Sequence, residues 1–200
     1  MNTANQNNLK PHTGDALLIV DVQNDFLPGG SLAVPHGDEV VTVLNRYLDI
    51  FAMQNLPVYA TRDWHPEQHC SFRMQGGPWP PHCVADTQGA QFAAALQLPP
   101  VAVIISKATT VEQDAYSGFQ GTNLDQQLRA ANIRRLFIGG LATDYCVLNT
   151  VRDALRLGYQ VLLLGDAIRA VDVQRGDGLR AEQEMTMLGA QRISVEGVAA

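Results

Sequence analysis

Cysteine is scarce in this chain. Only Cys70, Cys83 and Cys146 occur among 200 residues. An odd and small number of cysteines excludes a disulfide framework of the kind that holds small secreted domains together. We therefore expect a reducing, cytoplasmic setting, in which a thiol can be kept for its chemistry.

Positive charge and long apolar runs are also in short supply. Lys and Arg number 14 against 20 Asp and Glu, a formal net charge of -6, which argues against nucleic acid or an anionic membrane as a partner. No apolar run approaches the roughly 18 residues that a membrane helix needs. Residues 1–14 are polar and lack the apolar core of a secretion signal, so we expect a disordered lead-in before a single domain over residues 15–200.

What the chain has instead is an alternation of strand-length apolar runs and amphipathic stretches. The apolar runs are continuous, which is typical of strands buried on both faces. The expected strands are residues 16–20, 57–61, 101–106, 136–139, 160–164 and, more weakly, 192–195. The expected helices are residues 38–54, 90–96, 124–131, 144–157 and 178–188. This order predicts a three-layer α/β/α fold with a central, mainly parallel six-stranded sheet.

Reactive side chains follow the expected strands, at the edge of the sheet where ligands bind in open parallel folds. Asp21 follows the first strand, Asp63 and His65 follow the second, Lys107 follows the third and Cys146 lies just beyond the fourth. Each alone has an ordinary reading, such as a structural cysteine or a solvated lysine. Their convergence on one edge favours a catalytic site.

The expected helix around Cys146 gives that thiol a chemical role. With Thr143 or Asp144 as N-cap, Cys146 would lie in the first helical turn, where its pKa is lowered. The Gly139-Gly140 turn would permit close approach of a ligand and binding of an oxyanion by backbone amides. Asp21 could serve as general base and Lys107 could stabilise the thiolate.

Two long irregular segments, residues 27–37 and 63–89, interrupt the pattern, and loops of this length are usually functional. The second holds three of the five histidines, and the cluster consists of Asp63, His65, His69 and His82. A carboxylate and imidazoles suit one divalent zinc, iron or manganese ion per chain. Cys70 and Cys83 are alternative soft ligands, although adjacent residues on an extended segment tend to point apart.

Several short motifs then occur in one order from about residue 15 to residue 194. They are Asp21-Val22-Gln23-Asn24-Asp25-Phe26, Pro28-Gly29-Gly30-Ser31-Leu32, Asp63-Trp64-His65-Pro66, Trp79-Pro80-Pro81-His82-Cys83, Lys107, Ala115-Tyr116-Ser117-Gly118-Phe119 and Gly140-Leu141-Ala142-Thr143-Asp144-Tyr145-Cys146-Val147. Through them the chain resembles the nicotinamidase/pyrazinamidase group of the isochorismatase-like cysteine hydrolases. Where some members have His, position 145 is Tyr here, which bears on substrate preference.

The resemblance implies specific roles. Asp21, Lys107 and Cys146 would form a catalytic triad, and the amides of Ala142 and Cys146 an oxyanion hole beside a cis peptide between Leu141 and Ala142. Implied metal ligands are Asp63, His65, His69 and His82. Implied substrate-binding residues are Phe26, Trp79, Tyr116, Leu141 and Tyr145.

The expected function is hydrolysis of nicotinamide, and of pyrazinamide, to the acid and ammonia through a cysteine thioester, in NAD salvage. A related amidohydrolase for a ureido or carbamoyl compound is the alternative. A metal-stabilised binding domain would not need all three triad residues, and metal-bound hydroxide as nucleophile would leave Cys146 without a role. The partner expected is a small aromatic amide, and a homo-oligomer stays open.

Overall fold

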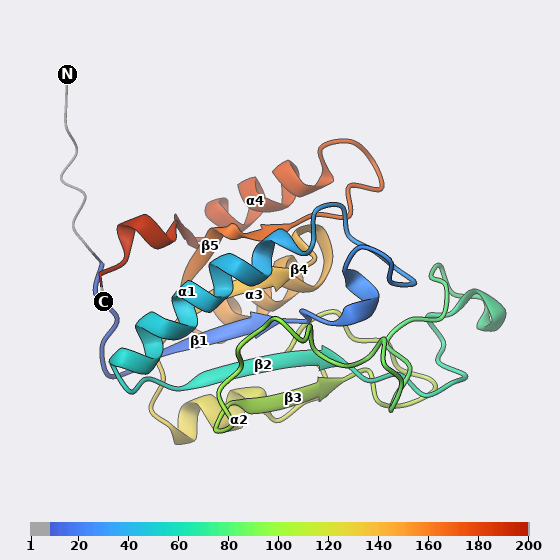
Figure 1. The fold of residues 1–200 in the computed structure, drawn as a ribbon, viewed down its shortest axis with the longest axis horizontal. Coiled ribbons are helices and arrows are strands. Elements are labelled where there is room, and N and C mark those ends of the chain that lie inside the picture. The colour runs from blue at the N-terminus through green and yellow to red at the C-terminus, as the bar shows by residue number, and fades with distance from the viewer. Residues whose placement is uncertain (1–8, 200) are drawn as a thin grey trace.

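Six parallel strands form the centre of the protein in the computed structural model, which describes residues 9–199 (Figure 1). The strand order is β3-β2-β1-β4-β5-β6, and every neighbouring pair is parallel. The strands are β1 (Asp15–Val20), β2 (Val58–Asp63), β3 (Val103–Lys107), β4 (Arg135–Leu141), β5 (Gln160–Arg169) and β6 (Gln191–Ile193). The predicted α/β fold with six strands is confirmed.

Helices cover both faces of the sheet. Helix α1 (Glu39–Met53) lies on one face, where Val40, Leu44, Tyr47 and Phe51 recur at helical spacing and pack into one buried core. On the other face a second core contains side chains from three helices: α2 (Leu124–Ala130), α3 (Leu148–Arg156) and α4 (Asp177–Met187). In Figure 1, α1 passes in front of the sheet and α3 behind it. Strand β1 is buried between the two cores, as its continuous apolar run predicts.

The order in which strands are added to the sheet reverses between β1 and β4. From β1 the strand order runs outward through β2 and β3 on one side, and from β4 through β5 and β6 on the other. All strands point the same way, and the loops that follow them gather at one end, on the right of Figure 1. In such sheets a crevice opens at the carboxyl ends of the two strands at the reversal. The residues after β1 and β4 therefore mark where a ligand can enter.

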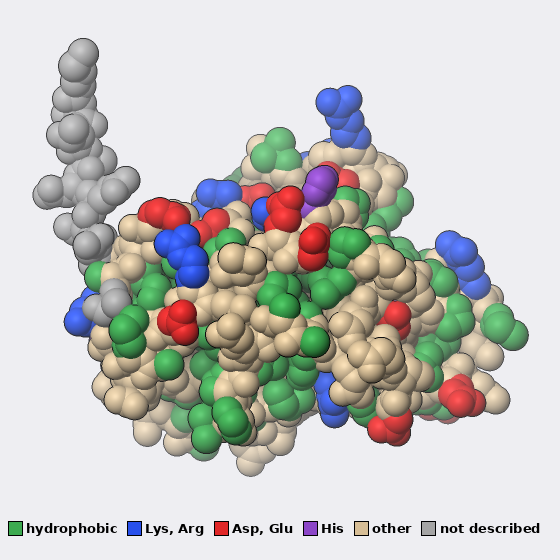
Figure 2. Space-filling view, in the orientation of Figure 1, with side chains coloured by type: hydrophobic (Ala, Val, Ile, Leu, Met, Phe, Trp, Pro, Cys, Tyr) green, Lys and Arg blue, Asp and Glu red, His purple; other side chains and the backbone are tan. Residues whose placement is uncertain are grey.

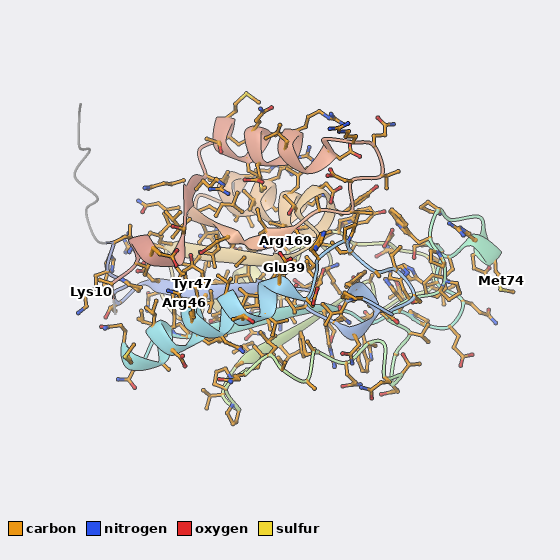
Figure 3. The ribbon with its side chains drawn as sticks, turned by 45° about the horizontal axis from the view of Figure 1, so that its top comes forward. Lys10, Glu39, Arg46, Tyr47, Met74 and Arg169 are labelled. Atoms are coloured by element: carbon orange, nitrogen blue, oxygen red, sulfur yellow. The ribbon has the colours of Figure 1, made fainter. Side chains whose placement is uncertain are left out.

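Polar contacts tie α1 to the long strand β5. Arg169 bonds Glu39 at 2.7 Å and the Tyr47 hydroxyl donates to Asp166 at 3.1 Å. Figure 3 shows Glu39, Tyr47 and Arg169 close to α1. The apolar pattern ends at Leu164, yet β5 continues to Arg169 through Gly165 and Asp166, with a register shift opposite Gly140. Because Gly165 and Asp166 interrupt the apolar residues, the apolar pattern does not reveal the second half of β5.

One predicted helix is wrong. Residues 90–96 form turns rather than a helix. Their backbone groups bond elsewhere: Ala93 N–H donates to the Val22 carbonyl and the Gln91 carbonyl accepts from Asn24, each at 2.9 Å. A seven-residue helix is marginal on propensity alone, so these tertiary bonds decide the local structure.

Two further boundaries differ. The helix expected over residues 144–157 is divided into a π-helical turn (Thr143–Val147) and α3. Of the lead-in expected over residues 1–14, residues 1–8 lie outside the described part of the chain, whereas Leu9 pairs with Val198 and packs on the core. No helix in the described part of the chain is long and apolar enough to span a membrane. On the face in Figure 2, Lys and Arg side chains lie scattered among acidic ones.

Candidate active site

A carboxylate, an ammonium and a thiol meet at the carboxyl end of the sheet. Asp21 directly follows β1, Lys107 is the last residue of β3, and Cys146 lies in the turn after β4. The Lys107 Nζ is 3.0 Å from Asp21 Oδ2 and 3.4 Å from Cys146 Sγ. It also bonds Asp63 Oδ1 at 2.5 Å and the Ala115 carbonyl at 3.0 Å. The strand ends thus bring together the three residues expected to react.

Burial governs the protonation of this cluster. Burial acts to lower the pKa of Lys107, but Asp21 and Asp63 raise it well above its usual value, so the lysine is an ammonium. Burial raises the pKa of Asp21, although Lys107 opposes this. Burial also raises the pKa of the Cys146 thiol, again against the effect of Lys107. The resting pair is therefore a thiol beside a carboxylate of raised basicity, which suits proton transfer between them.

Two expectations about the turn around Cys146 need correction. The N-cap position is Ala142, and neither Thr143 nor Asp144 caps with its side chain; Asp144 instead accepts from the amides of Val171 and Asp172. The pKa of the Cys146 thiol is not lowered as expected, because burial raises it and outweighs the lowering effect of Lys107.

The turn itself is shaped by Gly140 and by the peptide after it. Gly140 has φ +125°, and a Cβ there would lie 2.1 Å from the Val20 carbonyl oxygen. The glycine therefore permits close approach of β1 rather than of a ligand. The peptide between Leu141 and Ala142 is cis, as the resemblance implied. Ala142 and Cys146 both line the adjoining pocket.

Three of the four expected metal ligands lie together. Ligand atoms of Asp63, His65 and His82 lie within 4.8 Å of one another, and all three residues are buried. His65 Nδ1 lies 3.2 Å from the Ala108 carbonyl and His82 Nδ1 lies 2.8 Å from the Pro80 carbonyl. A carbonyl can only accept, so each ring is protonated on Nδ1 and presents an Nε2 lone pair to the site. Ligating histidines are usually oriented in this way.

This donor set fits a divalent ion. The buried His65 Nε2 has no hydrogen-bond partner among the described residues and is 3.7 Å from Asp63 Oδ2. Burial lowers the pKa of His65 to about 4 and lowers that of His82, so both rings are neutral at neutral pH. Burial acts to raise the pKa of Asp63, but Lys107 and His65 hold it below its usual value. A carboxylate with two neutral imidazoles is the ligand chemistry of zinc, iron and manganese sites.

His69 stands apart from the other three. Its ring stacks on His65 at 4.1 Å between centroids, but Nδ1 lies 2.8 Å from the Ser71 hydroxyl and Nε2 lies 3.1 Å from the Gln113 carbonyl. The structure therefore places His69 beside the set with both nitrogens engaged. The two alternative sulfur ligands, Cys70 and Cys83, do not belong to the set in the described structure.

Cys146 lines an aromatic pocket. Of the expected substrate-binding residues, Phe26, Trp79, Tyr116 and Tyr145 line it, and Trp79 Nε1 donates to the Tyr116 hydroxyl at 3.0 Å. Leu141 is the exception, because it is fully buried in the core beneath the sheet end. The pocket is also lined by residues not expected from the sequence: Leu32, Val34, Ser71, Asp114 and Val171.

Sequence reasoning also missed the residues that hold the reactive groups. The buried Gln23 carboxamide accepts from the Asp63 amide at 2.8 Å and donates to the Asp63 carbonyl at 2.8 Å. The Thr61 hydroxyl donates to Asp21 Oδ1 at 2.6 Å. Asp25 accepts from the Cys83 amide at 2.7 Å. A signal was available for Gln23 and Thr61, since polar residues within or next to a buried strand need partners.

A doubly wound parallel sheet with a buried Asp-Lys-Cys cluster beneath a small aromatic pocket defines a cysteine hydrolase for small molecules. The isochorismatase domain pattern matches residues 15–190, and the chain belongs to this family.

Among known proteins, the chain is similar to the nicotinamidase of Escherichia coli (strain K12), with 42% identity over 88% of this chain and 92% of that protein. It is also similar to the pyrazinamidase of Pyrococcus horikoshii, solved in complex with zinc. The identity is 48% and the TM-score 0.87, over 90% of this chain and 99% of that chain. A protein of L. infantum solved in complex with nicotinate is 37% identical, with a TM-score of 0.88 over 96% of this chain and 98% of that chain.

Proposed function

We propose that this protein hydrolyses nicotinamide to nicotinate and ammonia, with pyrazinamide as a second substrate, through a thioester on Cys146. The observation that carries the proposal is the Cys146 thiol, 3.4 Å from a lysine that also pairs with Asp21, at the base of a pocket of aromatic side chains. The similarity to a nicotinamidase, a pyrazinamidase and a nicotinate-binding protein supports it.

In the proposed reaction Asp21 takes the proton of Cys146 and the sulfur attacks the amide carbonyl carbon. Lys107 stabilises the thiolate as it forms, because its ammonium lies beside the sulfur. Asp21 then gives the proton to the amide nitrogen, and the C–N bond breaks to release ammonia. Water activated by Asp21 adds to the thioester, restoring the thiol and releasing nicotinate.

The oxyanion of the tetrahedral intermediate is assigned to the backbone amides of Ala142 and Cys146. Both residues line the pocket on the side where the turn after β4 begins. A donor of this kind contributes about 3 kcal/mol to transition-state stabilisation in acyl transfer. Fixed amides need no reorganisation when the charge develops, which suits a site built on the end of a strand.

Asp63, His65 and His82 are proposed to hold one divalent ion, with His69 as a fourth ligand once its Nε2 leaves the Gln113 carbonyl. Zinc, iron or manganese there would supply a Lewis-acid contact for the pyridine nitrogen. The residues of this chain would orient the rest of the ring, because Phe26, Trp79, Tyr116 and Tyr145 all line the pocket and Tyr145 packs against Trp79 and Tyr116. Orientation of the carboxamide over the thiol is a large source of rate acceleration.

The cellular setting is part of the same proposal. All three cysteines are unpaired, which supports a reducing, cytoplasmic environment. Nicotinate production would place the protein in NAD salvage. Assembly into a homo-oligomer is likewise proposed only as an expectation.

Ammonia release from nicotinamide tests the proposal, with metal analysis of the same preparation. The wild type should release ammonia and nicotinate in equal amounts, and Cys146→Ala should release none. Offering a carbamoyl compound in parallel separates the sister activity: faster release from that compound would overturn the nicotinamidase proposal. Full activity in Cys146→Ala would overturn the thioester.

A further inference from the structure

The Asp21 carboxylate has two oxygens in different surroundings. Oδ1 accepts the Thr61 hydroxyl proton at 2.6 Å, in a fully buried contact. Oδ2 accepts no hydrogen bond from the described residues and lies 3.0 Å from the Lys107 ammonium. A threonine hydroxyl has one proton, and a carboxylate can only accept it. Thr61 therefore occupies one oxygen and leaves Oδ2 with a free lone pair in the cluster that contains Cys146.

The backbone holds Thr61 opposite the end of β1. Thr61 pairs with Val20 in the parallel ladder, and its carbonyl accepts from the Asp21 amide at 3.2 Å. Asp21 itself has φ 50°, an uncommon conformation for a residue with a side chain. The same two residues are thus joined through the main chain and through their side chains.

The rotamer of Thr61 is held by Gly118. A Cβ at Gly118 would lie 2.8 Å from the Thr61 Cγ2 methyl, so the glycine leaves the space that this methyl fills. With the methyl against Gly118, the hydroxyl is directed to Asp21. Gly118 N–H is fixed in turn by the Thr150 hydroxyl at 3.0 Å.

We propose that Thr61 is a positioning residue, which orients Asp21 so that Oδ2 is the oxygen that takes the Cys146 proton. This inference rests on the proposed role of Asp21 as general base. It goes beyond that role by assigning the reacting oxygen and the residue that selects it. Without the hydroxyl, Oδ1 is an unsatisfied buried acceptor, and the carboxylate is no longer held in the orientation that presents Oδ2.

Two substitutions separate the hydroxyl from the methyl. Thr61→Val keeps the branched shape and should lower kcat about 10- to 100-fold with KM changed less than about threefold. Thr61→Ser keeps the hydroxyl and should stay within about threefold of the wild type in both parameters. The rate at which iodoacetamide alkylates Cys146, followed on the peptide that contains it, should fall in Thr61→Val and not in Thr61→Ser. If Val does not fold, Thr61→Ala replaces it, because Ser and Ala differ only in the hydroxyl.

Gly118→Ala provides a second test. Its methyl should displace Thr61 and lower kcat in the wild-type background, with a much smaller effect in Thr61→Ser, which has no Cγ2. Equal effects of Gly118→Ala in both backgrounds would contradict the role of the methyl contact.

The proposal is overturned if Thr61→Ser loses as much kcat as Thr61→Val, or if Val keeps wild-type kcat and alkylation rate. Alkylation needs no substrate, so it distinguishes this failure from a failure of the proposed function. A wild type without nicotinamide hydrolysis, but with slower alkylation in Val than in Ser, would overturn the substrate and leave the positioning role supported.

Discussion

The two halves of the site are built on different parts of the fold. The triad of Asp21, Lys107 and Cys146 lies at or just beyond the ends of paired strands, with Lys107 itself in register with Asp63. The histidines lie on the irregular segment 63–89, where loop bonds hold them: the His65 amide donates to the Cys83 carbonyl at 3.0 Å. Only Asp63, at the end of β2, belongs to both, because its carboxylate contacts Lys107 and faces His65. The nucleophile should therefore be largely independent of the loop that binds the ring.

Loss of the lysine should have the largest effect, because it breaks the triad half. Lys107→Met leaves the Asp21 and Asp63 carboxylates buried without their cation, and removal of one partner from a buried pair costs about 3–5 kcal/mol. We expect a lower urea midpoint together with loss of ammonia release. Arg46→Met is the control, since it breaks an exposed pair with Glu196 and should leave the midpoint nearly unchanged. Similar midpoints for the two variants would contradict the structural role of Lys107.

Substitution of the histidines should break only the other half. His65→Ala and His82→Ala each remove an Nε2 lone pair that is oriented to ligate the metal. The affinity for zinc should therefore fall at least tenfold in a competition titration with a chelating dye. The KM for nicotinamide should rise, while the rate of Cys146 alkylation should stay within about twofold of the wild type. His36→Ala, an exposed histidine outside the cluster, is the control. Slower alkylation in His82→Ala would show that the two halves are coupled.

Metal removal should affect the histidine half and leave the triad half intact, without any mutation. Treatment with a chelator should lower activity toward nicotinamide, and added zinc, iron or manganese should restore it. Alkylation of Cys146 should proceed at the same rate before and after treatment. Activity that survives complete metal removal would contradict a role for the ion in holding the substrate.

The smallest effect is expected at the aromatic wall of the pocket. Tyr116→Phe removes the hydroxyl that accepts from Trp79 Nε1, a single hydrogen bond between two loops. Its net value is about 1 kcal/mol, so KM should rise about fivefold with kcat and metal content unchanged. A change in kcat of the same size would place Tyr116 closer to the reacting atoms than the pocket geometry indicates.

The sequence predicted the triad half more completely than the histidine half. Apolar runs locate buried strands, and the ends of parallel strands converge, so Asp21, Lys107 and Cys146 could be placed together without any loop geometry. Loop geometry decides the histidines instead. The sequence could not indicate that His69 bonds Ser71 and Gln113 while His65 and His82 present free nitrogens.

The errors have a common cause in partners that lie far away in sequence. Residues 90–96 have helical composition, but Val22 and Asn24 bind their backbone. Leu141 belongs to the motif of the turn, yet its side chain enters the core. Thr61 lies within β2 and Gln23 lies just after β1, and the sequence does not name their partners, Asp21 and Asp63.

Acid-quenched mass spectrometry of the reaction with nicotinamide tests the central claim most directly. The account predicts a nicotinoyl group on the peptide that contains Cys146, which disappears as turnover proceeds, and none on Cys70 or Cys83. Turnover with an unmodified Cys146 at every time point, together with full activity in Cys146→Ala, would contradict it.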